Sequence, residues 1–530
     1  MVVPKPQKTA KRNGSFVISA NTEIVLNSNA REDDGIMNCV HALQTTFQRL
    51  SSNEITLQIS DSSKVLGSIF LEISDDLKNE SPTKNESYIL DVSTDRISIC
   101  APKSAGLFYG IQTLRQLVNV DRTRRKSHRL TVNCTQIQDE PRFEWRGLML
   151  DVSRHFFSVN EVKKFLDTMS LFKLNRFHWH LVDDQGWRIE ILRYPELTSI
   201  GAYRRGSPKP GHRTETQLVP YFGYYTQADI REVVAYAEER FITVVPEIEL
   251  PGHCQEVVAA YVDLGNTDIP DFEIPEVRMQ YGISPYTLNP STQSLDFLRN
   301  VFVEVLDLFP NSPFIHIGGD EAPTTQWAQS PFAQSEMIRL GFQTARELQG
   351  YFTSTIGEFL GDNGRTLIGW NEILEGRGLP DSAAVMVWNN AQAAIEAVEA
   401  GHRVVMAPTT HTYFDYPQSL LPTEPETIAG RLLELETVYS FDPVPPGLSE
   451  EEEKLIIGTQ GQLWSEYFWE SYQMEYNAFP RAIALAEVAW TTDKPSYDDF
   501  LARLEPELET LKSLNVNFRP LSNDNPSKSS

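Results

Sequence analysis

Short apolar segments alternate with amphipathic segments along most of this chain, and this alternation constrains the fold more than any other feature of the sequence. Repeated strand–helix units produce a parallel sheet, because each helix carries the chain back to the start of the next strand. The predicted strands are 147–152, 176–182, 243–250, 314–318, 366–370, 384–388, 403–407 and 455–460. Helical periodicity covers 160–174, 227–240, 293–308, 343–360, 391–400 and 472–489. Eight such strands in one stretch predict a (β/α)8 barrel.

The chain before Glu140 has a different pattern, in which strand-like runs, one of them at 55–59, are mixed with helices near 38–50 and 105–120. This mixture is typical of a small α+β domain. A chain of 530 residues also exceeds the usual span of one hydrophobic core. We therefore expect an N-terminal tail at 1–15, a small α+β accessory domain at 16–140, a catalytic barrel with C-terminal helices at 141–515 and a C-terminal tail at 516–530.

The net charge of the chain excludes two classes of partner. Asp and Glu number 72 against 47 Lys and Arg, which gives a formal net charge of −25. So acidic a protein repels a phosphate backbone and an anionic membrane surface, and we expect neither nucleic acid nor membrane as a partner. No apolar run has the length of a secretory signal or a transmembrane helix. The sequence as written predicts a cytoplasmic protein, or a secreted or periplasmic one if a signal has been removed, and a homodimer is one expectation.

Polar and aromatic residues gather directly after the predicted strands. Catalytic residues of a (β/α)8 barrel come from the C-terminal ends of its strands. The residues at these ends are Arg154, Asp183, His253, Asp320, Glu321, Trp370, Glu372, Trp388, Tyr413, Asp415, Trp464 and Glu466. This set predicts where the active site lies.

Two adjacent carboxylates, Asp320 and Glu321, follow the fourth predicted strand in the segment FIHIGGDEAP. The Gly-Gly pair before them allows backbone or ligand to approach closely. Because burial raises a carboxyl pKa, we expect Glu321 to stay protonated near neutral pH and to donate a proton, while Asp320 stays ionised. The alternative for Asp320 is a helix cap after the strand.

Several segments in register resemble motifs of the family 20 glycoside hydrolases, the β-N-acetylhexosaminidases. The barrel motifs are RGLMLDVSRHFF, FHWHLVDDQGWR, VVPEIELPGH, GGDE, GWNEI and QGQLWSE, in the order of the family. The segment AGLFYGIQTLRQL, at 105–117, resembles the small accessory domain of that family. Two departures stand in these motifs: Glu249 and Asn371 occupy positions where Asp is frequent. The resemblance covers nearly the whole chain.

The resemblance implies an exo-acting, retaining β-N-acetylhexosaminidase that removes terminal N-acetylhexosamine residues, GlcNAc or GalNAc, from oligosaccharides or glycoconjugates. In that mechanism the substrate's own acetamido oxygen attacks the anomeric carbon and forms an oxazolinium intermediate. Glu321 matches the acid/base, Asp320 the residue that orients the acetamido nitrogen, and Tyr413 the tyrosine that holds the acetamido oxygen. Asp183 and His253 resemble the Asp-His pair near the acid/base. The resemblance implies no cofactor and no metal.

The remaining strand-end residues match the sugar-binding positions of the family. Trp370, Trp388 and Trp464 would box the acetamido group. By the same resemblance Arg154 would bind the 3- and 4-hydroxyls, and Asp415 and Glu466 the 4- and 6-hydroxyls. From the residues alone, core packing explains a strand-end tryptophan, and a structural ion pair explains Arg154, equally well.

Two other functions remain open from the sequence. His178 and His180 form an HxH pair that points to one face of a strand, a spacing that zinc hydrolases use, so a metal-dependent amidohydrolase on the same barrel is the second hypothesis. The family motif contains these histidines without a metal, which favours a structural role for them. The third hypothesis is a non-catalytic carbohydrate-binding protein on a hydrolase scaffold.

Overall fold

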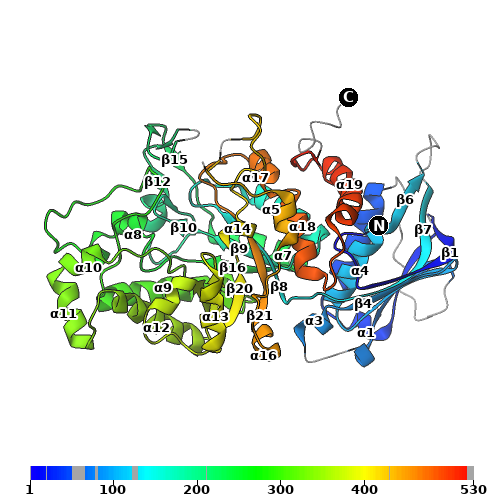
Figure 1. The fold of residues 1–530 in the computed structure, drawn as a ribbon, viewed down its shortest axis with the longest axis horizontal. Helices are drawn as coiled ribbons and strands as arrows, with labels where there is room; N and C mark the ends of the chain where they lie inside the picture. The colour runs from blue at the N-terminus through cyan, green and yellow to red at the C-terminus, as the bar shows by residue number, and fades with distance from the viewer. Residues whose placement is uncertain are drawn as a thin grey trace.

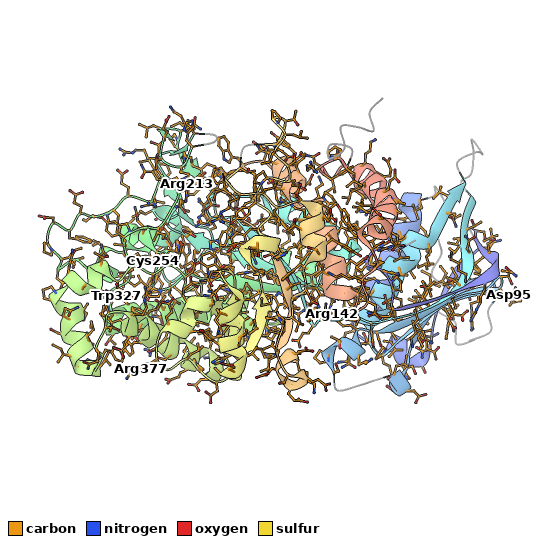
Figure 2. All side chains as sticks on the ribbon, in the orientation of Figure 1. Asp95, Arg142, Arg213, Cys254, Trp327 and Arg377 are labelled. Carbon is orange, nitrogen blue, oxygen red and sulfur yellow. The ribbon has the colours of Figure 1, made fainter. Side chains whose placement is uncertain are left out.

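The computed structural model describes residues 2–19, 21–50, 66–77, 81–121, 129–209, 212–425, 427–428 and 430–521. An accessory domain and a barrel lie side by side (Figure 1). Arg142 lies where the two domains meet (Figure 2). The strand predicted at 55–59, and residues 522–530 of the predicted C-terminal tail, lie outside the described residues. Of the helices described, none is long and apolar enough to cross a membrane.

The described residues beyond the domain junction form a closed barrel of eight parallel strands, which confirms the predicted (β/α)8 fold. The strands, in barrel order, are β8 (Trp145–Asp151), β9 (Arg176–His180), β16 (Thr243–Glu247), β17 (Phe314–His316), β18 (Thr366–Trp370), β19 (Ala384–Val387), β20 (Arg403–Met406) and β21 (Ile456–Leu463). Each lies on one predicted strand.

The main helices cover the outside of the barrel. They are α5 (Val159–Leu171), α7 (Gln227–Glu238), α9 (Thr292–Leu308), α12 (Arg346–Asp362), α13 (Ala391–Glu399), α15 (Leu435–Ser440), α17 (Ser471–Ala478), α18 (Arg481–Trp490) and α19 (Tyr497–Ser513). The connection from β18 to β19, described throughout, contains the short 3-10 helix η3 (Asn371–Glu375) and no α-helix. The single helix predicted at 472–489 is two, α17 and α18, because Pro480 between them has no N–H to continue the first one.

Shorter elements occupy the loops of the barrel domain. They are β10 (Val182–Asp183), β11 (Gly186–Trp187), α6 (Glu196–Ser199), β12 (Tyr203–Arg204), β13 (Ser207–Pro208), β14 (Thr216–Gln217), β15 (Tyr221–Phe222), α8 (Gln255–Ala260), η2 (Val262–Leu264), α10 (Thr325–Gln329), α11 (Pro331–Leu340), α14 (Thr409–Thr412) and α16 (Glu450–Glu453).

The accessory domain is an α+β unit whose described residues hold a seven-stranded sheet in the order β1-β7-β4-β5-β3-β2, with β6 beside β7. Its strands are β1 (Lys8–Ile18), β2 (Glu23–Leu26), β3 (Ser68–Ile73), β4 (Tyr88–Val92), β5 (Arg96–Ala101), β6 (Val118–Asp121) and β7 (Arg129–Asp139). Its helices are α1 (Ser28–Arg31), η1 (Asp75–Leu77), α3 (Pro82–Asn85), α2 (Ile36–Leu50) and α4 (Ser104–Leu117). The last two bury apolar faces in a core shared with the sheet.

Residues within both predicted tails take part in the described structure. Strand β1 begins at Lys8, inside the stretch 1–15, and its side chains from Lys8 to Ser15 are exposed. Backbone pairing with β7 therefore defines this part of the strand, and no apolar alternation was present for a sequence pattern to detect. At the other end Arg519 is buried, and its Nε donates to Glu424 at 2.7 Å.

A buried lysine joins the two domains. Lys173, in the turn between α5 and β9, places its Nζ 3.0 Å from Asp139 Oδ2 and 2.9 Å from the hydroxyl of Tyr88, both in the accessory domain. The same Nζ lies 4.3 Å from the ring centre of Trp490, whose indole N–H donates to Asp139. Burial lowers the pKa of Lys173, and Asp139 opposes that shift. The cation therefore has its partners in place at a fully buried position.

Lys173→Met should lower the free energy of unfolding by about 3–5 kcal/mol, because it leaves the carboxylate of Asp139 buried without its cation. Lys84→Met is the matched control, since Lys84 pairs with Glu140 at a position where both side chains are exposed, and its loss should cost no more than about 1 kcal/mol. Urea unfolding followed by tryptophan fluorescence measures both. Equal, small losses in the two variants would contradict a structural role for the buried pair.

Candidate active site

The predicted site residues meet at one end of the barrel, because the parallel strands that carry them all end there. Contacts connect them across strands. Arg154 Nη2 lies 2.7 Å from Asp183 Oδ2, and Asp183 Oδ1 lies 3.2 Å from His253 Nδ1. His253 Nε2 in turn lies 3.7 Å from Asp320 and 3.6 Å from Glu321. A chain of alternating charge therefore runs from the end of β8 to the end of β17.

The turn that presents the two carboxylates has a strained backbone. Gly318 and Gly319 have φ of 63° and 93°, and Glu321 itself has φ of 49°. A Cβ on Gly318 would lie 1.6 Å from Glu249 Oε2, so this position requires glycine. The next helix, α10, begins after Thr324. Asp320 is therefore not the helix cap that the alternative interpretation required.

The buried member of the carboxylate pair is Asp320, not Glu321 as the sequence predicted. The side chain of Asp320 is 14% exposed, whereas that of Glu321 is 36% exposed. Burial raises the pKa of Asp320 to about 8, against the opposing effect of His253. Sequence order could not distinguish the two carboxyls, because their exposure depends on the left-handed backbone conformation of Glu321.

His253 is a cation placed between two pairs of carboxylates. Its Nδ1 lies 3.2 Å from Asp183 and 3.4 Å from Asp184, and its Nε2 faces Asp320 and Glu321. Burial lowers the pKa of His253, but Asp183 and its neighbours outweigh that effect and raise it well above its ordinary value. The imidazolium thus lowers the pKa of Asp320 from inside the site.

Arg154 makes the structural ion pairs that one interpretation of the sequence predicted. Its Nη1 lies 3.2 Å from Asp151 and its Nε donates to Gln185 at 2.8 Å, in addition to the contact with Asp183. The guanidinium also lies 5.2 Å from the ring centre of Trp464. These contacts fix the guanidinium at the rim of the site, where a forked donor can meet hydroxyl groups.

Four aromatic rings form a continuous wall across four strand ends. Trp388 stacks on Tyr413 with ring centres 6.3 Å apart, Tyr413 lies 6.3 Å from Trp464, and Trp464 lies 5.9 Å from Trp370. Trp370 is only 1% exposed, as core packing predicted, whereas Trp388 and Trp464 are partly buried. Burial, followed by Asp415 and Asp320, raises the pKa of Tyr413, so its hydroxyl remains a donor.

Asp415 and Glu466 lie together on the side of the site near Arg154. Burial raises the pKa of both carboxyls; Glu466 further raises that of Asp415, and Arg154 opposes the shift of Glu466. Several buried polar atoms here have no hydrogen-bond partner among the described residues: Asp415 Oδ1, Glu466 Oε2, Asp320 Oδ1 and Trp464 Nε1. Because such atoms are costly without a partner, this end of the barrel suits a ligand rich in hydroxyl and amide groups.

Charged residues that the sequence analysis left without a role lie beneath the site, inside the barrel. Glu247 Oε2 lies 2.9 Å from His178 Nε2, and its Oε1 lies 2.7 Å from His316 Nδ1. His180 Nδ1 lies 3.3 Å from Asp151. Both histidines of the HxH pair thus contact carboxylates, as the structural interpretation of the pair expects. The sequence could have indicated Glu247, because it and Glu249 are two residues apart, as His178 and His180 are, and residues two apart on a strand point to the same face.

Comparison with known proteins identifies the family. The sequence profile described as glycosyl hydrolase family 20, catalytic domain, matches residues 143–493, and the profile of domain 2 of the same family matches residues 1–140. The chain belongs to glycosyl hydrolase family 20. Both profiles match in the order of the two domains seen in the structure.

Curated relatives and solved structures agree with this membership. A beta-hexosaminidase of Porphyromonas gingivalis is 37% identical over 523 residues, which cover 98% of this family 20 chain and 64% of the relative. A beta-hexosaminidase of Vibrio furnissii is 34% identical, over 93% of this chain and 77% of the relative. The crystal structure of a family 20 exo beta-N-acetylglucosaminidase from Vibrio harveyi, in complex with N-acetylglucosamine, matches with a TM-score of 0.86 at 33% identity, over 98% of this chain and 78% of that one.

The two residues that depart from the family motifs have defined contacts. Glu249 Oε2 accepts from the backbone N–H of Gly319 at 3.4 Å, under the turn that carries Asp320. Asn371 Oδ1 accepts from the backbone N–H of Trp388 at 3.2 Å. Glu249 therefore supports the turn before Asp320, and Asn371 supports the backbone of Trp388.

Proposed function

We propose that this family 20 chain is an exo-acting, retaining β-N-acetylhexosaminidase that hydrolyses terminal, non-reducing GlcNAc or GalNAc residues by substrate-assisted catalysis. The observation that carries the proposal is the buried Asp320 beside the more exposed Glu321, with the aromatic wall and Tyr413 next to them. The N-acetylglucosamine bound to the Vibrio harveyi relative supports this class of substrate.

The proposed first step uses the substrate's acetamido group as the nucleophile. Asp320 accepts the acetamido N–H, and the Tyr413 hydroxyl donates to the acetamido oxygen. That oxygen forms a bond to the anomeric carbon as the glycosidic C–O bond breaks, and Glu321 gives its proton to the departing oxygen. The positive charge of the oxazolinium ring lies beside Asp320, and this charge favours the ionised carboxylate in spite of its burial.

The second step restores the enzyme. Glu321, now a carboxylate, takes a proton from water as the water oxygen bonds to the anomeric carbon from the side that the leaving group left. The bond between the anomeric carbon and the acetamido oxygen breaks, the acetamido group reforms, and the product keeps the original anomeric configuration. Arg154, Asp415 and Glu466 hold the ring hydroxyls and close the site beyond the terminal sugar, which makes the cleavage exo-acting.

Glu321→Gln should lower kcat by at least about a hundredfold, because general-acid catalysis typically contributes 10²–10⁴-fold. The loss should be smaller for a substrate with an activated phenolate leaving group, which needs less protonation. Steady-state rates on a nitrophenyl glycoside and a chitobiose substrate measure the difference. Equal loss on both would remove Glu321 from the acid role.

Replacing the substrate's 2-acetamido group by a hydroxyl should abolish hydrolysis of an otherwise identical glycoside, because the nucleophile would be lost. A thiazoline that mimics the oxazolinium ring should also bind far more tightly than substrate. Rates on the matched pair of glycosides and the inhibition constant test both expectations. Efficient cleavage of the plain glucoside would refute substrate assistance.

His253→Asn should move the acidic limb of the profile of kcat/KM against pH to higher pH. Activity needs Asp320 ionised and is lost as pH falls through the pKa of that carboxyl in the free enzyme. The His253 cation lowers this pKa, so its removal raises the pKa and the limb follows. His41→Asn, an exposed position in the accessory domain, is the control and should leave the limb in place. An acidic limb that stays in place in His253→Asn would show that His253 does not lower the pKa of Asp320.

A further inference from the structure

The indole N–H groups of the aromatic wall are held in different ways. Trp370 donates to Glu247 Oε1 at 2.9 Å, inside the barrel, where His178 and His316 share the same carboxylate. Trp388 donates to Glu372, with Nε1 2.9 Å from Oε2 and 3.2 Å from Oε1. The barrel interior thus fixes Trp370, whereas one side chain at the rim holds the indole of Trp388.

We infer that Glu372 is a positioning residue that sets where Trp388 stands, and thereby the length of the N-acyl group that the site accepts. This inference rests on the proposed function, in which Trp388 is one wall around the acetamido group. Glu372 acts through the indole of Trp388, which it touches, and needs no contact with the sugar.

Helix η3, which carries Glu372, is placed so that it can fix the position of Trp388. Helix η3 follows β18 directly, and both Asn371 and Glu372 are more than nine-tenths buried. Asn371 accepts from the backbone N–H of Trp388 while Glu372 accepts from its indole, so η3 holds this tryptophan at both ends. Two hydrogen bonds from consecutive residues define one orientation of the ring.

Helix η3 is also packed against the turn that presents the carboxylate pair. A Cβ added to Gly319 would lie 2.8 Å from Ile373 Cγ2, and a Cβ added to Gly369 would lie at the same distance from that atom. Ile373 is 1% exposed, so it has no space to retreat. Helix η3 therefore holds Trp388 at a fixed position relative to the backbone turn that carries Asp320. A fixed separation between Trp388 and Asp320 is needed if Trp388 is to limit the length of the acyl group.

Glu372 has a second effect, which the test must separate from the first. Its negative charge raises the pKa of Asp320, after burial and against His253. Glu372→Gln keeps a carbonyl oxygen that can accept from the indole but removes the charge. Glu372→Ala removes both. Acyl selectivity should follow the acceptor, whereas the pH profile should follow the charge.

The experiment compares kcat/KM on nitrophenyl glucosaminides that carry N-acetyl, N-propionyl and N-butyryl groups. Glu372→Ala should raise the N-butyryl to N-acetyl ratio about tenfold, since a methylene in an apolar pocket is worth about 10–200-fold in discrimination. Glu372→Gln should keep the wild-type ratio and should move the acidic limb of its pH profile to lower pH. Trp388→Phe, which removes the donor, should relax the ratio as Glu372→Ala does.

The double variant Glu372→Ala with Trp388→Phe gives the sharpest control. If the two residues act as one unit, it should show no more relaxation than either single variant. An unchanged ratio in Glu372→Ala, whatever the ratio in Trp388→Phe, or a relaxation in Glu372→Gln as large as in Glu372→Ala, overturns the inference. Should Glu372→Ala fail to fold, Glu372→Leu, which has a similar size and no hydrogen-bond acceptor, takes its place with the same expected ratio. A wild-type protein inactive on the N-acetyl substrate would instead overturn the proposed function itself.

Discussion

The contacts of the Glu247 carboxylate hold together the strands that lie beneath the site. This carboxylate lies fully buried inside the barrel and contacts His178 of β9, His316 of β17 and Trp370 of β18, at 2.7 to 2.9 Å. A buried carboxylate needs polar partners close to it, and partners drawn from neighbouring strands cannot move independently. The strands that lead to Asp320 and Trp370 are therefore connected to one another beneath the site.

Above this floor, charges of opposite sign alternate across the site. Arg154 lies between Asp151 and Asp183, and His253 lies between Asp183 and the carboxylate pair. Each cation lowers the pKa of the carboxylates beside it, although burial still raises the pKa of Asp320 to about 8. In the proposed mechanism, the positive charge that develops beside Asp320 lowers this pKa further, so that the buried carboxyl is ionised at that step.

The accessory domain supports the barrel where its first strands begin. Arg146 of β8 pairs with Glu86 of the accessory domain at 2.7 Å, and Lys173, just before β9, pairs with Asp139. Helix α19, after the last barrel strand, reaches the same domain through the contact of Glu507 with Arg115 (Figure 1). One neighbouring unit thus holds both ends of the barrel sequence, the first strands and the C-terminal helix.

The eight strands, the end of the barrel that carries the site and the adjacent Asp320 and Glu321 could all be predicted from the sequence, because hydrophobic periodicity and strand-end chemistry are local properties. Three features became visible only in the folded chain: Asp320 is the more buried carboxyl, Glu247 contacts residues of three other strands, and Glu372 accepts from the indole of Trp388. The tertiary structure also decided that β1 begins at Lys8, where pairing with β7 replaces any apolar pattern. Burial, charge pairing and strand pairing each depend on residues distant in the chain, and no local pattern records which distant residue becomes the neighbour.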